Sequence, residues 1–154
     1  MKKTLPWLSG LSALLAAFLV TPHAATGTDG SHAPWTADRR HCVVDMTNNQ
    51  QISCYKTAAQ VGAAIDAGII GIGYSGFDYQ GPSLTFVGNR RCTPTLADVD
   101  HEARFPFLLA INSFRTFASC RSNLSDRAGR ETGYRIDHPN LGQLGGMIVR
   151  IRWS

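Results

Sequence analysis

The sequence lacks several features that would assign it to a common functional class. It has no long apolar run after residue 20, and it contains no CxxC or HExxH pair. The first absence excludes a later transmembrane helix, which needs about 20 apolar residues. The second removes the usual spacings of zinc ligands. What remains, with 44% hydrophobic and 17% charged residues, is typical of a compact globular domain rather than a disordered chain.

The first 25 residues have the layout of a secretory signal peptide. Lys2 and Lys3 give a positive start, residues 8–20 are almost uninterruptedly apolar, and small residues follow at Ala24 and Ala25. The run is too short to span a bilayer comfortably, so a retained membrane anchor is the less favoured alternative. We therefore predict a signal at 1–25, a flexible leader at 26–40 and one extracellular domain at 41–154, with no membrane association after signal removal.

Basic charge is scarce in the predicted mature chain. The formal net charge falls from +4 to +2 once Lys2 and Lys3 are removed, and Lys56 is then the one lysine left. Proteins that bind nucleic acid neutralise a dense row of phosphates and need a stronger basic excess. We expect no nucleic acid among the partners.

All four cysteines follow the predicted signal, at Cys42, Cys54, Cys92 and Cys120. An even number in a secreted chain favours two disulfides, for which three connectivities exist. We expect Cys42–Cys54 and Cys92–Cys120, because each pair is sequential and joins segments that should lie close together. In the chain-entropy model these two crosslinks contribute about 3 and about 3.6 kcal/mol.

The first half of the domain predicts a hairpin, a helix and two strands. Within residues 42–55, β-branched residues stand on both sides of a polar turn at 47–50. This pattern indicates a hairpin. Thr57 and Gln60 form a capping box, which predicts one short helix over 57–67 at an edge or end of the sheet. Residues 69–72 and 83–87 read as strands.

The second half predicts further short strands. We expect 93–103 to be irregular, 108–117 to be one strand with Ile111 and Phe114 in the core, 119–132 to be a loop and 133–136 to be a short strand. In the last strand, one face is expected to carry Met147, Val149, Ile151 and Trp153, and the other Ile148, Arg150 and Arg152. Many short strands with a single helix predict a mainly β fold, an antiparallel β-sandwich.

The stretch YSGFDYQGPSLTF, residues 74–86, resembles the Greek-key signature of the βγ-crystallin superfamily. The resemblance assigns the aromatic corner to Tyr74 and Tyr79, the left-handed backbone position to Gly81 and the hairpin tie to Ser83. It implies a Greek-key β-sandwich, and the hairpin and short helix at 42–67 resemble the leader of secreted actinobacterial members.

A second, weaker unit covers 123–134, where Gly129 and Thr132 stand in the glycine and serine places but the aromatic corner is missing. Microbial members of this superfamily often bind calcium, which needs six to eight oxygen ligands. The equivalent places here, 108–113 and 144–149, lack most of those oxygens. We therefore expect no metal and no cofactor.

Two motifs in the same region indicate turns rather than sites. Residues 71–76 match GxGxxG, but a dinucleotide site needs a helix opening on the last glycine, and FDYQGP follows instead. Ser75 lies near a nucleophile-elbow pattern, in which Phe77 occupies the place of the second glycine.

Two clusters of charged residues are candidate sites. Asp98, Asp100, His101 and Glu102 could supply an acid and a base for a small hydrolase, although a solvated loop is the commoner explanation. The candidate partner-binding residues are Arg135, Arg150 and Arg152, which could share a basic surface with Arg115 and Arg121.

The preferred functional hypothesis is a secreted, non-catalytic domain that binds an extracellular protein or a cell-surface polymer. Inhibitor-like and toxin-like roles are what the crystallin resemblance permits, and fold alone does not select between them. The hydrolase built on residues 98–102 is the alternative hypothesis.

Overall fold

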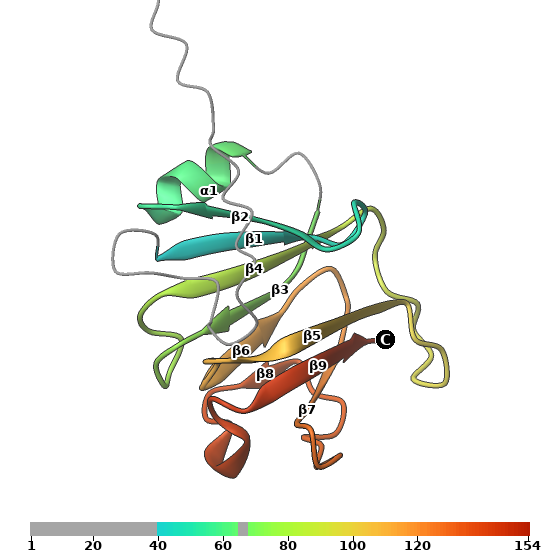
Figure 1. Ribbon diagram of the computed structural model, residues 1–154. Coiled ribbons are helices and arrows are strands. Elements are labelled where there is room, and N and C mark those ends of the chain that lie inside the picture. The colour runs from blue at the N-terminus through green and yellow to red at the C-terminus, as the bar shows by residue number, and fades with distance from the viewer. Residues whose placement is uncertain (1–39, 65–67) are drawn as a thin grey trace, which may run out of the picture.

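The computed structural model describes residues 40–64 and 68–154 (Figure 1). The predicted signal at 1–25, all but the last residue of the leader predicted at 26–40, and the end of the predicted helix at 65–67 lie outside the described residues. Within the described part of the chain, no helix is long and apolar enough to cross a membrane.

The described residues are mainly β-strands in two sheets, as predicted. The larger sheet has the order β2-β1-β4-β3-β6-β8 and the smaller one β5-β9-β7. The elements are β1 (His41–Asp45), β2 (Gln51–Tyr55), α1 (Ala58–Ala64), β3 (Gly68–Tyr74), β4 (Ser83–Gly88), β5 (His101–Leu109), β6 (Ser113–Thr116), β7 (Ser122–Ser125), β8 (Asp137–His138), the 3₁₀-helix η1 (Gly142–Leu144) and β9 (Ile148–Trp153).

Both sheets contribute to one apolar core, whose centre is aromatic. Phe86 of β4, Phe114 of β6 and Trp153 of β9 are fully buried. The ring centroids of Phe86 and Trp153 lie 5.1 Å apart, and those of Phe86 and Phe114 lie 5.8 Å apart. Such contacts between large rings contribute beyond the area that they bury. They join the middle of the larger sheet to the central strand of the smaller one.

The predicted N-terminal hairpin and both disulfides are confirmed. β1 and β2 pair with Cys42 directly opposite Cys54, and these two cysteines form one disulfide. The second joins Cys92 to Cys120. It connects the segment before β5 to the turn between β6 and β7.

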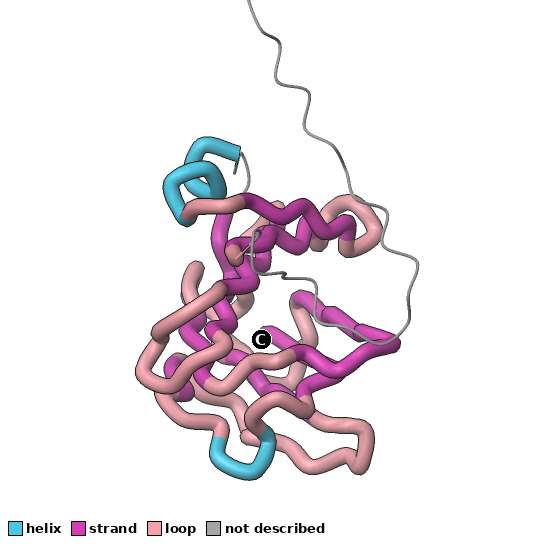
Figure 2. Tube along the Cα trace, turned by 60° about the vertical axis from the view of Figure 1, so that its left-hand side comes forward, coloured by secondary structure: helices cyan, strands magenta, loops and turns pink. Residues whose placement is uncertain are grey.

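The predicted helix begins with the expected capping box. The Gln60 amide donates to Thr57 Oγ1 at 3.3 Å, and the Thr57 amide donates to Gln60 Oε1 at 3.1 Å. On this short helix, Val61 packs with Val43 and Val87, on the face of the larger sheet turned away from the main core. Figure 2 shows α1 at one end of the molecule, beside the β1–β2 hairpin.

The glycines of the GxGxxG stretch allow close packing of the two sheets. A Cβ on Gly71 would lie 2.6 Å from Phe114 Cζ and 2.9 Å from Trp153 Nε1. A Cβ on Gly73 would lie 2.6 Å from Ile111 Cδ1. Both glycines belong to β3, and no helix follows them. The motif therefore serves core packing in this chain.

Three predictions about strands were wrong. The sheets are not wholly antiparallel, because β1 and β4 pair in parallel. The chain between these two strands passes through β2, the helix α1 and β3. Residues 108–117 do not form one strand: β5 ends at Leu109 in the smaller sheet and β6 begins at Ser113 in the larger one. In the last strand Ile148 is buried, because the β5–β9 ladder shifts register between Arg104 and Leu109 and breaks the alternation.

The segment 119–132, predicted as a loop, contains the buried strand β7. Two of its buried polar side chains have hydrogen-bond partners. Ser122 Oγ lies 2.9 Å from Thr116 Oγ1, and Asn123 Nδ2 donates to Glu131 Oε2 at 2.8 Å. The short strand expected at 133–136 is instead β8, which begins directly after that range. Within the range, Arg135 forms an isolated bridge with Ser122.

The outer edge of β5 is closed to further pairing near its middle. The Arg104 amide donates to Gln50 Oε1 of the β1–β2 turn at 3.1 Å. Pro106 has no N–H to offer, and its carbonyl accepts from Arg127 Nη2 at 2.7 Å. An unpaired strand edge is a template for association with another chain. Here Gln50, Pro106 and Arg127 remove that template near the middle of β5.

Buried His138 predicts a loss of stability in mild acid. Burial lowers the pKa of this imidazole, and the neighbouring Arg135 adds to the effect, against opposing contributions from the Ser122 carbonyl and Asp137. The folded state therefore takes up this proton less readily than the unfolded state. Stability should be fully present above about pH 6.5, the unfolded pKa, and should decrease as the pH falls toward the lower folded pKa.

The prediction is tested with the His138→Gln variant, whose amide can still donate to the Ser122 carbonyl, the partner of His138 Nε2 at 3.2 Å. Urea unfolding between about pH 7.5 and pH 5 should show a decline in the wild-type protein that is smaller in the variant. Equal declines in both proteins would show that His138 is not the cause.

Candidate functional site

The outer face of the smaller sheet carries a two-row array of charged and polar side chains, which we call the charged face. One row is Arg104, Arg150 and Ser125, which lie opposite one another on β5, β9 and β7. The next row is Glu102, Arg152 and Asn123 on the same three strands. Residues two apart on a strand point to the same side. Their neighbours Ala103, Ile151 and Leu124 point into the core and are fully buried.

Glu102 holds the arginines of the charged face in place. Its carboxylate accepts from Arg150 Nε at 2.8 Å and from Arg150 Nη2 at 3.3 Å, and it also pairs with Arg104 Nε. Burial raises the pKa of Glu102, but the hydrogen bonds from Arg150 and Arg104 outweigh it, so the pKa lies below its usual value. Glu102 is therefore ionised at neutral pH and shared by two guanidinium groups.

Arg152 is held by a different carboxylate. It pairs with Glu131, which lies beyond β7, and its guanidinium carbon lies 5.9 Å from the centre of the Tyr134 ring. Its Nε is buried and has no hydrogen-bond partner among the described residues. Arg152 is thus fixed along the edge of the charged face nearest β7.

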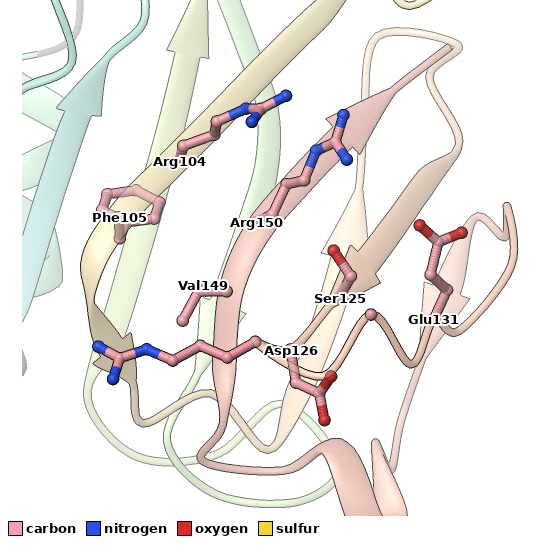
Figure 3. Close-up of a pocket in the computed structure, with 9 residues that line it drawn as sticks. Arg104, Phe105, Ser125, Asp126, Glu131, Val149 and Arg150 are labelled. Carbon is pink, nitrogen blue, oxygen red and sulfur yellow. The ribbon is translucent and has the colours of Figure 1, made fainter.

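A shallow groove of about 300 Å³ lies beside the first row (Figure 3). Arg104 and Arg150 stand at one end of the groove, and Asp126 and Glu131 lie on the opposite side. The remaining lining residues are Phe105, Ser125, Arg127, Gly129 and Val149. The groove therefore combines basic, acidic and apolar surface within a small area.

The loop after β7 forms one wall of the groove and is internally fixed. Asp126 accepts from the Arg130 amide at 3.0 Å and from Arg130 Nε at 2.7 Å, and Gly129 turns the chain with φ +79°. Burial raises the pKa of Asp126, but the hydrogen bonds from Arg130 outweigh it and the net pKa is lowered. Asp126 and Arg130 thus satisfy each other.

The predicted basic surface is divided among different places. Arg150 and Arg152 are together on β9, as the alternation predicted. Arg135 does not line the groove. Arg115 lies on the larger sheet, where its guanidinium stacks 4.0 Å from the centre of the Tyr79 ring and pairs with Asp137. The sequence analysis missed Arg104, which lies just after the segment predicted as irregular, and Arg127, which lies in the segment predicted as a loop.

The acidic segment at 98–102 does not converge on a site. Asp100 accepts from the Thr93 amide at 2.7 Å, and this bond, against an opposing effect of burial, lowers the pKa of Asp100. His101 Nε2 lies 3.2 Å from the Arg90 carbonyl, and Glu102 belongs to the charged face. Neither Asp98, Asp100 nor His101 lines the groove. The described residues contain no group of three acidic, histidine or cysteine side chains that could hold a metal ion.

The residues of the crystallin-like signature surround the loop between β3 and β4. The rings of Tyr74 and Tyr79 meet edge to face at 5.8 Å, and Gly81 has φ +85°. Ser83 Oγ lies 2.8 Å from His41 Nδ1 of β1. The hydroxyl that ties the loop is that of Ser113, which accepts from the Tyr79 amide at 3.0 Å and donates to the Gly76 carbonyl at 2.7 Å.

Comparison with known proteins leaves the chain without an assigned relative. No family model, no characterised protein and no solved structure matches it.

Proposed function

We propose that this chain is a secreted, non-catalytic binding domain that contacts an extracellular partner through its charged face. The observation that supports this most directly is the state of Arg150. Glu102 fixes its guanidinium, while the same side chain borders an open groove. Glu102 occupies one nitrogen of Arg104 and two of Arg150, and each guanidinium has further N–H donors for a ligand. A pre-positioned arginine loses little side-chain entropy on binding.

Secretion and the absence of catalysis belong to the same proposal. Two disulfides are consistent with an extracellular protein, since such bonds persist in oxidising compartments. The side chains of the alternative hydrolase are each engaged locally, with Asp100 bonded to Thr93 and Glu102 to arginine. The partner on this proposal is an extracellular protein or cell-surface polymer, with an inhibitor-like or toxin-like outcome.

The proposal includes a Greek-key, βγ-crystallin-like architecture. In its support, Gly81 and Gly129 both have positive φ at the two places where the resemblance puts a glycine. The edge contact between Tyr74 and Tyr79 supplies an aromatic corner in the first unit. The two sheets share one core, as a sandwich requires.

The binding function is tested by affinity capture from culture medium and from cell-wall material. The immobilised mature chain should retain a reproducible partner, and the Arg150→Ala, Arg152→Ala double variant should retain it at least roughly tenfold less, because buried arginine anchors dominate many interfaces. Arg91→Ala is the matched control, since Arg91 is exposed and lies outside the groove. Equal capture by the wild type and the double variant would contradict the charged face as the contact surface.

A further inference from the structure

Building on the proposed binding function, we infer that the groove beside the charged face recognises an acidic peptide segment of the partner. The arginines bind one carboxylate of this segment, and the apolar side chain that follows it lies on the groove floor. The inference names the ligand chemistry of the groove, which the proposed function leaves open. It rests on how basic, apolar and acidic groups are distributed along the groove (Figure 3).

Arg104 and Arg150, at one end of the groove, supply the donors for the carboxylate, and Arg127 adds a third positive charge to the groove lining. Arg104, Arg127 and Arg150 all line the groove. Arg150 is held by Glu102, and Arg127 is held through its Nη2, which donates to the Pro106 carbonyl at 2.7 Å. A guanidinium presents parallel N–H groups that match the two oxygens of a carboxylate. The arginines already bind one carboxylate, that of Glu102, and together they carry more positive charge than it neutralises. The basic end of the groove therefore favours one more anion.

Apolar surface lies next to those arginines. Phe105 is buried from solvent except for 8% of its surface, and Val149 is partly exposed. Both line the groove. Because the Phe105 ring packs in the core against Phe86, Val149 offers most of the contact to one aliphatic side chain beside the bound carboxylate. This pairing of an anion with an apolar neighbour is a property of a peptide segment.

The opposite wall disfavours a uniform polyanion such as a phosphate polymer. Asp126 and Glu131 line that wall, and Asp126 is ionised because its pKa is lowered by Arg130. Repeated phosphates that cross the groove would approach these carboxylates, and like charges a few ångströms apart repel. A ligand with a single carboxylate can keep its charge at the basic end.

Recognition through side chains also agrees with the closed edge of β5. A peptide cannot readily add to this sheet as a further strand beside Arg104, because the Arg104 amide is bonded to Gln50 and Pro106 has no N–H. At this edge, recognition of ligand side chains is therefore favoured over addition of the ligand backbone as a strand.

The inference is tested by NMR titration of the ¹⁵N-labelled mature chain with two blocked synthetic peptides, Gly-Leu-Glu-Leu-Gly and its Glu→Gln twin, at about 150 mM salt. The Glu peptide should give saturable shifts of amides at 125–131 and 148–150, with an affinity at least roughly fivefold above that of the Gln peptide. Arg127→Ala and Arg150→Ala should each weaken the Glu peptide at least roughly fivefold, and Arg91→Ala should leave it unchanged. Arg127→Ala keeps the Glu102 pairs intact, and the spectrum of each variant reports whether it is folded.

Three outcomes would overturn the inference: no saturable shifts up to about 5 mM peptide, a range that covers even weak binding; equal affinity for both peptides; or tighter binding of inorganic polyphosphate to the same amides. The result is separable from the proposed function. If partner capture depends on Arg150 and Arg152 while the Glu peptide does not bind, the binding function stands and the ligand class is wrong. If the Glu peptide binds while capture is unaffected, the proposed function is wrong.

Discussion

Replacing Trp153 with alanine is expected to lower the free energy of unfolding by about 3–5 kcal/mol, the usual cost of removing a large aromatic side chain from a core. Trp153 is the second residue from the end of the sequence, yet it is fully buried. It packs against Phe86 and Phe114 and fills the space that Gly71 leaves open. The surrounding strands cannot fill such a cavity without shifting the two sheets relative to each other. Urea unfolding followed by far-UV circular dichroism measures the change.

Trp153→Phe is the matched control. The indole Nε1 is buried and has no hydrogen-bond partner among the described residues, and an unpaired buried N–H costs about 1–3 kcal/mol. Phenylalanine removes that unpaired N–H, which stabilises the folded state, and leaves a smaller ring, which weakens the packing. These effects oppose each other, so the net decrease in the free energy of unfolding should be below about 1.5 kcal/mol. If Trp153→Phe destabilised the protein as much as Trp153→Ala, ring packing would not be the dominant contribution.

Removing the second disulfide with Cys92→Ser and Cys120→Ser is expected to cost about 3.6 kcal/mol in the chain-entropy model, because the crosslink closes the longer of the two loops. The sequence separation is 28 residues, against 12 for Cys42–Cys54. Cys92 and Cys120 lie in segments that belong to no strand, and besides the disulfide a backbone hydrogen bond from the Cys92 amide to the Ala118 carbonyl links these segments. For a domain of this size the loss corresponds to a fall in Tm of roughly 10–15 °C.

Calorimetry of the oxidised wild type and the double serine variant measures this change. Cys42→Ser with Cys54→Ser provides the comparison, with an expected loss of about 3 kcal/mol because this disulfide closes a shorter loop. A fall of less than about 2 °C for the Cys92 and Cys120 variant would contradict the entropic argument.

The elements that sequence patterns predicted correctly depend on neighbouring residues. The β1–β2 hairpin and the start of α1 are specified within a few positions, by a polar turn and by the Thr57–Gln60 capping box. The disulfide pairing was predicted because sequential cysteines join adjacent segments. In each case the interaction that forms the element lies within the stretch of sequence that was read.

The elements that were missed depend on partners far along the chain. β7 reads as a polar loop, and it is a strand because β9, much further along the chain, supplies its ladder. The hydrogen bonds of Asn123 to Glu131 and of Ser122 to Thr116 then satisfy polar side chains of the buried strand. The break between β5 and β6 is equally invisible locally. Between these two strands, the Asn112 amide donates to the Tyr74 carbonyl of β3 at 2.8 Å. Periodicity alone contains no information about such contacts.

The candidate site was predicted in part for the same reason. Arg150 and Arg152 alternate with core residues in the last strand, so their shared face could be read from the sequence. Arg104 has the same alternation with Ala103 and Phe105, but the acidic residues before it led to the prediction of an irregular segment over 93–103, and Pro106 reads as the start of a new apolar stretch. A proline is compatible with an edge strand, and β5 is such a strand. That signal could have revealed Glu102 and Arg104 as members of the charged face.

The closed edge of β5 has a consequence for how this protein can diversify. Because Gln50 and Pro106 hinder another strand from pairing beside the middle of β5, contact with a partner at this place favours side chains that point away from the core. Arg104 is exposed and Arg150 partly so, and neither belongs to the apolar core. Surface substitutions of this kind usually change stability by less than about 0.5 kcal/mol. Related chains could therefore exchange the residues of this face, and with them their targets, while the scaffold beneath remains the same.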